Sequence, residues 1–299
     1  CHYELVPVRG RVEQVEEILA TCTVSDASTT SLDHCGASLE DLLARVQASP
    51  AELVAGLVAA GAVVKDGRAA TFSPTYAAEL TALALSFVIE HDWQHTAVPA
   101  QTLREYLPDR PGWHVDHCMA LLSQRQSASA AAAEAVTATP AAVEAACRAT
   151  LPALVPMDGA EGGIWCLDPQ RTALAVARIK FGAAGPTTGG FHQPLDAFML
   201  EWSASLPSGI TPQLEWLKGV ALVEERAGAQ VLSYFPEEAL PLDPRERFAA
   251  LFSVRPQWRQ EDLAPYLSGL LGPGVTEAKL LLRHARLVQD GGQRYFTAR

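Results

Sequence analysis

SLEDLLARVQASPAELVAGLVAAGAVVKDGRAATF, residues 38–72, contains the order of elements that decides the fold. Ser49, Pro50 and Glu52 have the spacing of a capping box, in which Ser49 accepts from free helix amides and Pro50 takes the first helical position. Asp66-Gly67 supplies the positive φ of a tight hairpin turn. The stretch therefore predicts a helix, a turn, a second helix and a two-stranded hairpin.

The same order returns three more times along the chain. We expect further hairpins within 153–167, 211–235 and 276–298, with apexes near 162, 228 and 292, beside the one near 67. Helices that lead into a two-stranded β-wing describe a winged helix, which is a variant of the helix-turn-helix. We predict a mainly α fold with short β-hairpins, built as a tandem array of three to four winged-helix units.

The segments between the hairpins set the predicted domain organisation. A long, mostly buried helix is expected over 74–93, an Ala-rich tethering insertion that is part helix over 127–146, and a loop over 181–190. The predicted domains are a lead-in helix and linker (1–36), winged-helix unit 1 with the long following helix (37–95), winged-helix unit 2 with the Ala-rich insertion (96–190), a winged-helix-like unit 3 (191–243), and a basic C-terminal winged-helix unit (244–299).

Composition limits the class of protein. The 299 residues are 48% hydrophobic and 19% charged, as in globular chains. No apolar run reaches the ~18 residues of a membrane span, so we expect a soluble chain. Six scattered cysteines without a CxxC pair favour reduced thiols in a cytosolic or nuclear protein. Because the first residue is Cys1, we expect a fragment or a trimmed gene product.

Positive charge is concentrated near the C-terminus of an acidic chain. The formal net charge is −11, yet residues 244–299 hold nine basic and five acidic residues. Such asymmetry suggests a protein partner for the acidic body and a polyanion for the basic end.

The basic end supplies the candidate DNA-binding residues. Lys279, Arg283 and Arg286 recur at i, i+4 and i+7, so we predict that they share one face of a helix at the recognition position of the last unit. A solvated helix face is the alternative. Arg294 and Arg299 are expected on or beside the wing, and Arg255 and Arg259 should flank the basic helix.

The stretch 247–267, which precedes that helix, is predicted to be mostly core. Trp258 should pack at a helix start, with Glu261 and Asp262 in the first turn, where the helix dipole favours acids. The expected core residues of this stretch are Phe248, Leu251, Phe252, Leu263 and Leu267.

The one pattern that suggests an enzyme is His91-Asp92-Trp93-Gln94-His95. On a continuous helix the two histidines would share a face, as in zinc proteases, with Asp92 as the base and His114, His117 or Cys118 as a third ligand. However, Val98-Pro99 should end the helix soon after His95. His117 and Cys118 are more simply core residues. We therefore expect no metal, no cofactor and no catalytic residue; neither a G-x-x-x-x-G-K-[ST] nor a G-x-S-x-G motif occurs.

Several ordered stretches resemble one known family. ERFAALFSVRPQWRQEDLAPYL (246–267) with LEWLKGVALVEE (214–225) resembles the C-terminal half of the defective-in-sister-chromatid-cohesion protein family. The stretches 3–19, 39–62 and 164–179 resemble other segments of that family, and they follow one another in the same order. The likeness covers most of 3–299, whereas the Ala-rich insertion and the 181–190 loop have no counterpart.

The resemblance implies a non-catalytic role in the nucleus. Family members are non-ATPase subunits of an alternative replication factor C clamp loader and act in DNA replication and sister chromatid cohesion. The implied partners are the other loader subunits, the catalytic subunit of DNA polymerase epsilon, single- and double-stranded DNA and, indirectly, the sliding clamp. The polymerase is expected to meet an unidentified surface of unit 1, and the later units should meet DNA. The family's N-terminal β-rich part, which docks on the other loader subunits, has no counterpart here. A free-standing winged-helix DNA-binding regulator and a zinc-dependent hydrolase are the two alternatives.

Overall fold

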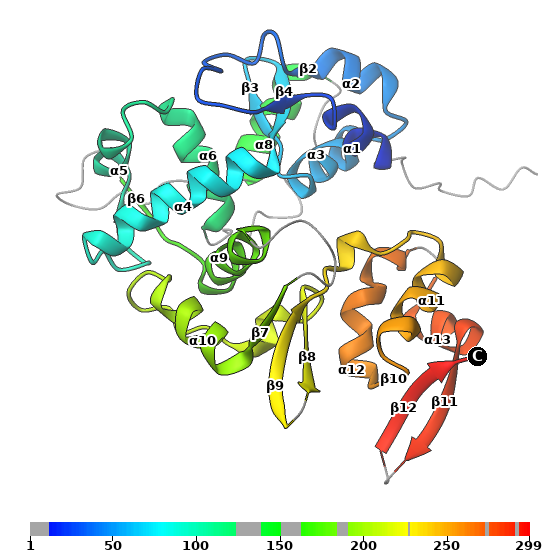
Figure 1. Cartoon of the computed structure of the whole chain (residues 1–299). Coiled ribbons are helices and arrows are strands. Elements are labelled where there is room, and N and C mark those ends of the chain that lie inside the picture. The colour runs from blue at the N-terminus through cyan, green and yellow to red at the C-terminus, as the bar shows by residue number, and fades with distance from the viewer. Residues whose placement is uncertain are drawn as a thin grey trace, which may run out of the picture. The chain divides into compact units, whose positions relative to one another are not determined.

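A computed structural model describes residues 12–123, 139–150, 163–183, 191–226, 228–272, 275–290 and 293–299. These residues form two compact units, the first within 1–176 and 205–211 and the second within 177–204 and 212–299. Helices dominate both, and the strands are short (Figure 1). The predicted mainly α fold with short strands is confirmed, whereas the winged-helix identity of its parts and the predicted domain boundaries stay predictions.

The first module of unit one contains the opening stretch of the sequence. Ser49 caps the helix that begins at Pro50. Its hydroxyl accepts from the Glu52 amide at 3.3 Å, and the Glu52 carboxylate accepts from the Ser49 amide at 2.9 Å. Asp66 and Gly67 have φ of 53° and 73° at the predicted turn. Its elements are α1 (Glu13–Leu19), β1 (Thr23–Val24), β2 (Ala37–Ser38), α2 (Leu39–Arg45), α3 (Pro50–Ala59), β3 (Val63–Lys65) and β4 (Arg68–Phe72).

A second module follows in the same unit. Its short strands β5 and β6 pair antiparallel, and Leu167 forms a bridge with Ser123. The predicted hairpin apex near 162 lies outside the described residues. The elements of the module are α4 (Pro74–Glu90), β5 (Val98–Pro99), α5 (Ala100–Tyr106), α6 (Gly112–Leu122) and β6 (Ile164–Trp165).

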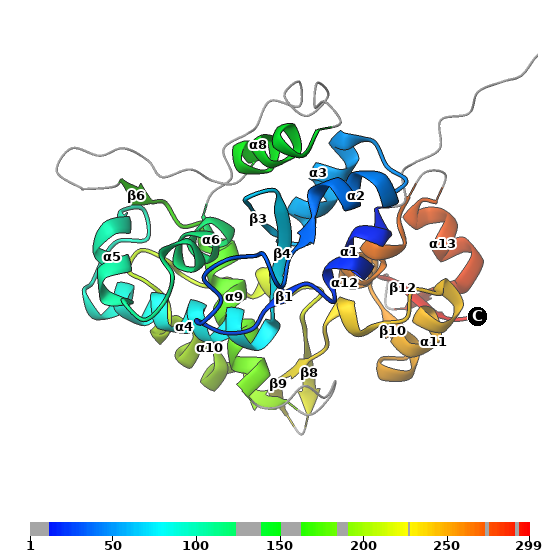
Figure 2. The same ribbon diagram turned by 90° about the horizontal axis from the view of Figure 1, so that it is seen from above.

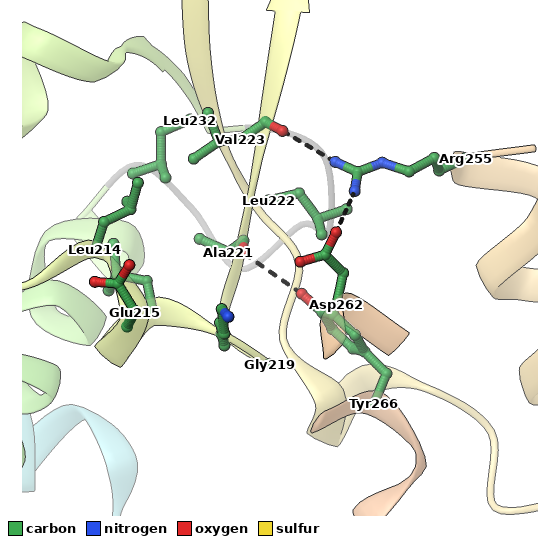
Figure 3. Close-up of a pocket in the computed structure, with 12 residues that line it drawn as sticks. Leu214, Glu215, Gly219, Ala221, Leu222, Val223, Leu232, Arg255, Asp262 and Tyr266 are labelled. Carbon is green, nitrogen blue, oxygen red and sulfur yellow. Dashed lines mark hydrogen bonds and ion pairs between the residues drawn. The ribbon is translucent and has the colours of Figure 1, made fainter. Parts of the chain in front are cut away.

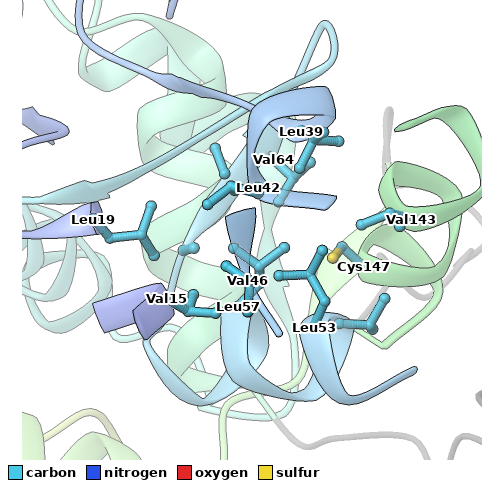
Figure 4. Close-up of a cluster of buried hydrophobic side chains, with 13 residues drawn as sticks. Val15, Leu19, Leu39, Leu42, Val46, Leu53, Leu57, Val64, Val143 and Cys147 are labelled. Atoms are coloured by element: carbon cyan, nitrogen blue, oxygen red, sulfur yellow. The ribbon is translucent and has the colours of Figure 1, made fainter. Parts of the chain in front are cut away.

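Helix α8 (Pro140–Thr150) comes from the Ala-rich region but packs into the first module, beside α2 and α3 (Figure 2). Val143 and Cys147 are buried against Leu53 and Val64 in one apolar cluster (Figure 4). The tethering role predicted for this region is therefore wrong for its last part, which is a core helix. Residues 124–138 lie outside the described part of the chain.

A third module lies mostly in unit two. Its aromatic core stacks Phe181 on Phe198, with ring centroids 5.3 Å apart, and on Tyr234 at 4.8 Å. The elements are α9 (Pro169–Ala183), β7 (His192–Pro194), α10 (Leu195–Ala204), the 3-10 helix η1 (Leu214–Leu217), β8 (Ala221–Arg226) and β9 (Ala229–Tyr234).

The last elements of unit two form what we call the C-terminal module, residues 244–299. Its core contains Phe248, Leu251, Leu263 and Leu267, with Phe252 packed against them, as predicted. The short η2 (Glu237–Ala239) precedes the module. The elements are α11 (Pro244–Val254), β10 (Gln257–Trp258), α12 (Gln260–Leu263), η3 (Ala264–Leu270), α13 (Glu277–His284), β11 (Ala285–Asp290) and β12 (Gln293–Ala298).

One sheet topology recurs in three modules. In each, a first short strand pairs with the last strand of the hairpin that follows it, which gives the orders β2-β4-β3, β7-β9-β8 and β10-β12-β11; the first sheet has a fourth strand, β1, which pairs with β4 in parallel outside this shared order. All pairings within the shared order are antiparallel. The repeated order read from the sequence thus corresponds to a repeated small sheet closed by a hairpin.

Candidate nucleic-acid interface

Helix α13 presents the first predicted cations. The Thr276 hydroxyl caps the helix by accepting from the Lys279 amide at 3.4 Å, and the helix ends at His284. Lys279 and Arg283 are exposed and one turn apart. Arg286 lies beyond the helix in β11, so the prediction that all three share one helical face is wrong. The chain becomes extended at Ala285, because Leu287 and Val288 pair with β12 instead of continuing the helix.

The β11–β12 hairpin carries Arg286 and Arg294. Because Leu287 pairs with Phe296 and Gln289 with Arg294 in an antiparallel register, these four side chains project from the same face of the hairpin. Both arginines are exposed. Arg294 thus lies in the hairpin predicted at the C-terminal end, whereas the identity of this hairpin as a wing stays a prediction.

A groove of about 800 Å³ lies between α13 and this hairpin. We call it the α13–wing groove. Its apolar lining includes Leu282 and Leu287, whose exposed fractions are 77% and 54%. The groove is lined by Gln260, Ala278, Leu281, Leu282, Ala285, Arg286, Leu287, Arg294, Phe296 and Arg299. The structure thus brings three of the predicted arginines together, whereas Lys279 and Arg283 do not line the groove.

Arg299 holds the chain end against α13. Its Nη1 donates to the carbonyl oxygens of Leu282 and Arg283, each at 2.9 Å. A cation at the C-terminal end of a helix also interacts favourably with the helix dipole.

Arg255 has internal partners. Its Nη2 donates to the Val223 carbonyl at 2.9 Å, its Nη1 lies 3.8 Å from the Asp262 carboxylate, and its guanidinium stands 4.9 Å from the centre of the Trp258 ring. Arg255, Val223 and Asp262 line a cavity of about 170 Å³ together with Tyr266 (Figure 3). Arg255 is thus a structural link within unit two, which weakens its assignment to DNA binding.

Arg259 is more accessible. Its side chain is 49% exposed, and its guanidinium lies 3.8 Å from the Glu261 carboxylate, a separation at which an exposed pair contributes little. Arg259 and Arg294 both line a shallow hollow next to the α13–wing groove.

Arg247 is the buried cation that sequence reasoning missed. Its side chain is only 2% exposed and donates to the carbonyl oxygens of Pro241, Tyr266 and Leu240 at 2.7, 2.8 and 3.2 Å. The Glu237 carboxylate lies 3.7 Å away. The charge is therefore used to join segments of unit two and is not presented at the surface.

The histidines of the zinc alternative do not share a helix. Helix α4 ends at Glu90, and Asp92 has a φ of 51°, a left-handed conformation that a right-handed helix does not contain. Nδ1 of His91 pairs with the Phe87 carbonyl at 2.9 Å, whereas Nδ1 of His95 pairs with that of Ser208 at 3.1 Å. Among the residues that the structure describes, no three His, Cys, Asp or Glu side chains are grouped as metal ligands.

The other proposed ligands are core residues of unit one, as predicted for His117 and Cys118. Nδ1 of His114 pairs with the Tyr76 hydroxyl at 2.8 Å, and Nε2 of His117 with the Gly61 carbonyl at 3.0 Å. Burial lowers the pKa of each imidazole to about 4 and raises the pKa of the Cys118 thiol to about 11.

Over the described ranges, no single helix is long and apolar enough to cross a membrane. Helices α2 and α3 meet that criterion only as a pair bent by 117°.

Comparison with known proteins identifies a family over most of the chain. The family model described as sister chromatid cohesion protein Dcc1 matches residues 1–267. Sister chromatid cohesion protein DCC1 of Danio rerio is 26% identical over the whole chain, which covers 68% of that relative. The Homo sapiens protein of the same name is 26% identical over 87% of this chain and 57% of its own length. The Saccharomyces cerevisiae protein is 27% identical over 37% of this chain and 29% of its own length.

Proposed function

Because the chain belongs to the Dcc1 family, whose role is in sister chromatid cohesion, we propose that it acts there as a non-catalytic subunit of an alternative replication factor C clamp loader. In this role it works in the nucleus during DNA replication and links other proteins to DNA. The repeated small sheets support the proposal, since a chain of similar modules offers several separate binding surfaces.

We interpret each repeated module as a winged helix. The C-terminal module carries the fullest set of parts: a first helix (α11), a short strand (β10), two further helical segments (α12 and α13) and a hairpin whose last strand pairs with that first short strand. In this interpretation α13 is the recognition helix and β11–β12 is the wing.

The observation that carries the proposed DNA contact is the exposed positive charge of the C-terminal module. Lys279 and Arg283 line the outer side of α13, and Arg286 and Arg294 occupy the wing. These side chains, with Arg259 and Arg299 beside them, are suited to phosphate oxygens, which position a protein on single- or double-stranded DNA without reading its sequence. Arg255 is left out because its guanidinium has internal partners.

The polymerase contact is the second part of the proposal. We assign binding of the catalytic subunit of DNA polymerase epsilon to the first module and DNA binding to the C-terminal module. The sliding clamp is reached only through the other loader subunits. A pull-down of the full chain with the catalytic subunit, repeated after digestion of nucleic acid, tests this part. Retention without nucleic acid supports direct contact, and loss of retention contradicts it.

A free-standing DNA-binding regulator is the second candidate, and the cationic surface of the C-terminal module favours it equally. Salt-dependent DNA binding by a chain that retains neither the polymerase nor the other loader subunits would select this candidate over the adaptor.

A further inference from the structure

The α13–wing groove has an apolar lining that phosphate binding leaves unused. Leu282 and Leu287 are among the most exposed large apolar side chains of the described residues, at 77% and 54%, and both line the groove with Phe296. Burying an exposed leucine removes apolar surface from water and so stabilises a complex. Two exposed leucines in one groove of about 800 Å³ therefore mark a binding surface, whereas single exposed leucines are ordinary.

The charge around this lining is positive. Arg286, Arg294 and Arg299 line the groove, and none of its ten lining residues is acidic. Gln260, at the edge, donates to the Glu277 carboxylate at 2.9 Å, so its amide has a partner on α13. An occupant must therefore combine apolar side chains for the leucines with negative charge for the arginines.

We propose that the α13–wing groove binds a short acidic segment of a partner protein, which inserts aliphatic or aromatic side chains between Leu282 and Leu287 and sets carboxylates against Arg294, on the same face of the hairpin as Leu287. The volume is that of a pocket that holds a few side chains. Nucleic acid is the less suitable occupant, because phosphate and sugar contacts leave the two leucines exposed. This inference does not depend on the proposed role in cohesion or on DNA binding.

The test is a selection of random twelve-residue peptides displayed on phage. Phage that bind a Leu282→Ser/Leu287→Ser variant are removed first, and the remaining phage are selected on the full chain. We expect enrichment of peptides that combine Leu, Ile or Phe with Asp or Glu. A synthetic, fluorescently labelled peptide of the enriched sequence should bind the full chain, and its affinity should fall at least tenfold in the double-serine variant. Arg294→Gln should also weaken peptide binding, and its effect should be larger at low salt.

The matched control is Leu200→Ser, which removes an equally exposed leucine (75%) from α10, outside the groove. It should bind the peptide as the wild-type chain does. Because all three leucines are exposed, each variant should keep the wild-type circular dichroism spectrum and Tm.

Two further measurements separate other occupants. If no acidic-apolar peptide is enriched and the double-serine variant loses affinity for a labelled 20-base-pair duplex, the groove is a nucleic-acid surface and the proposal is overturned. It is also overturned if light scattering shows a dimer that the double-serine variant converts to monomer, because the occupant is then a second copy of the chain. Unchanged duplex affinity and unchanged mass in the variant, together with lost peptide binding, support the proposal.

Discussion

Arg247 Nη1 donates a 2.8 Å hydrogen bond to the carbonyl oxygen of Tyr266, nineteen residues further along the chain. The contact joins α11 to η3 inside the core of the C-terminal module. The guanidinium also reaches two carbonyl oxygens of the segment before α11, those of Leu240 and Pro241. One buried cation thus donates to backbone carbonyl groups of separate segments.

Replacing this cation should destabilise the second unit. Arg247→Met keeps an apolar stem but removes the guanidinium that donates to these carbonyl oxygens, so we expect a loss of about 3 kcal/mol in the free energy of unfolding. Arg245→Met, an exposed change on the same helix, should alter it by less than about 0.5 kcal/mol. Urea unfolding followed by tryptophan fluorescence measures both, and equal effects would contradict the structural role of Arg247.

Two glycines with positive φ should differ in their response to alanine. A Cβ at Gly67 (φ 73°) meets nothing within 4 Å, so the cost is conformational strain of about 1 kcal/mol. A Cβ at Gly209 (φ 88°) would lie 2.7 Å from Nδ1 of His95. We expect Gly209→Ala to lower the free energy of unfolding of unit one by roughly twice as much or more. Equal losses would show that residues 205–211 do not pack against the chain around His95.

Thiol reactivity tests the placement of α8. Cys147 on α8 is buried, and burial raises its pKa to about 12, whereas Cys22 and Cys166 are partly exposed. Because the thiolate is the reactive form, iodoacetamide at pH 8 should modify Cys22 and Cys166 well before Cys147. Mass spectrometry of tryptic peptides reads out the order. Early modification of Cys147 in the native protein would contradict the docking of α8 on the first module.

Acid should destabilise unit one through its buried histidines. Burial lowers the pKa of His114 and His117 from 6.5 to about 4, so the unfolded chain takes up their protons first as the pH falls. The stability that these neutral histidines contribute to the folded unit is fully present above about pH 6.5 and is lost progressively between pH 6.5 and 4. We expect the urea midpoint of the wild-type chain to fall as the pH is lowered from 7 to 5. The fall with pH should be less steep in His117→Asn. In the control His34→Asn, which changes an exposed histidine, it should be as steep as in the wild-type chain. An identical slope in all three proteins would refute this assignment.

Local signals in the sequence predicted much of the fold. The capping box at Ser49 and the Asp66-Gly67 turn depend on neighbouring residues, and both occur as predicted. Helix α4 ends at Glu90, earlier than the end predicted soon after His95, because Asp92 adopts a positive φ that the pattern of apolar residues does not reveal. The Ala-rich region gave no sign that Val143 and Cys147 would fill a distant core, because that contact is made by tertiary packing alone.

The candidate site was predictable only in outline. The excess of basic residues at 244–299 is a property of composition, so it could be read directly. Whether an arginine faces water is decided by distant partners, which is why Arg247 and Arg255 proved to be structural. The sequence also placed Arg286 on a helix because its spacing from Arg283 is helical, whereas strand pairing with Thr297 draws it into the wing.

The central claim is tested most directly by titrating a labelled 20-base-pair duplex with the full chain and with Lys279→Glu/Arg283→Glu/Arg286→Glu. The control Arg45→Glu/Lys218→Glu/Arg226→Glu changes the net charge equally at exposed positions outside the C-terminal module. We predict at least tenfold weaker binding for the first variant and nearly wild-type binding for the control. Wild-type affinity should drop on the order of a hundredfold over a fourfold rise in salt if about four phosphates are neutralised. Unchanged binding by the first variant, or equal losses in both, would contradict the account.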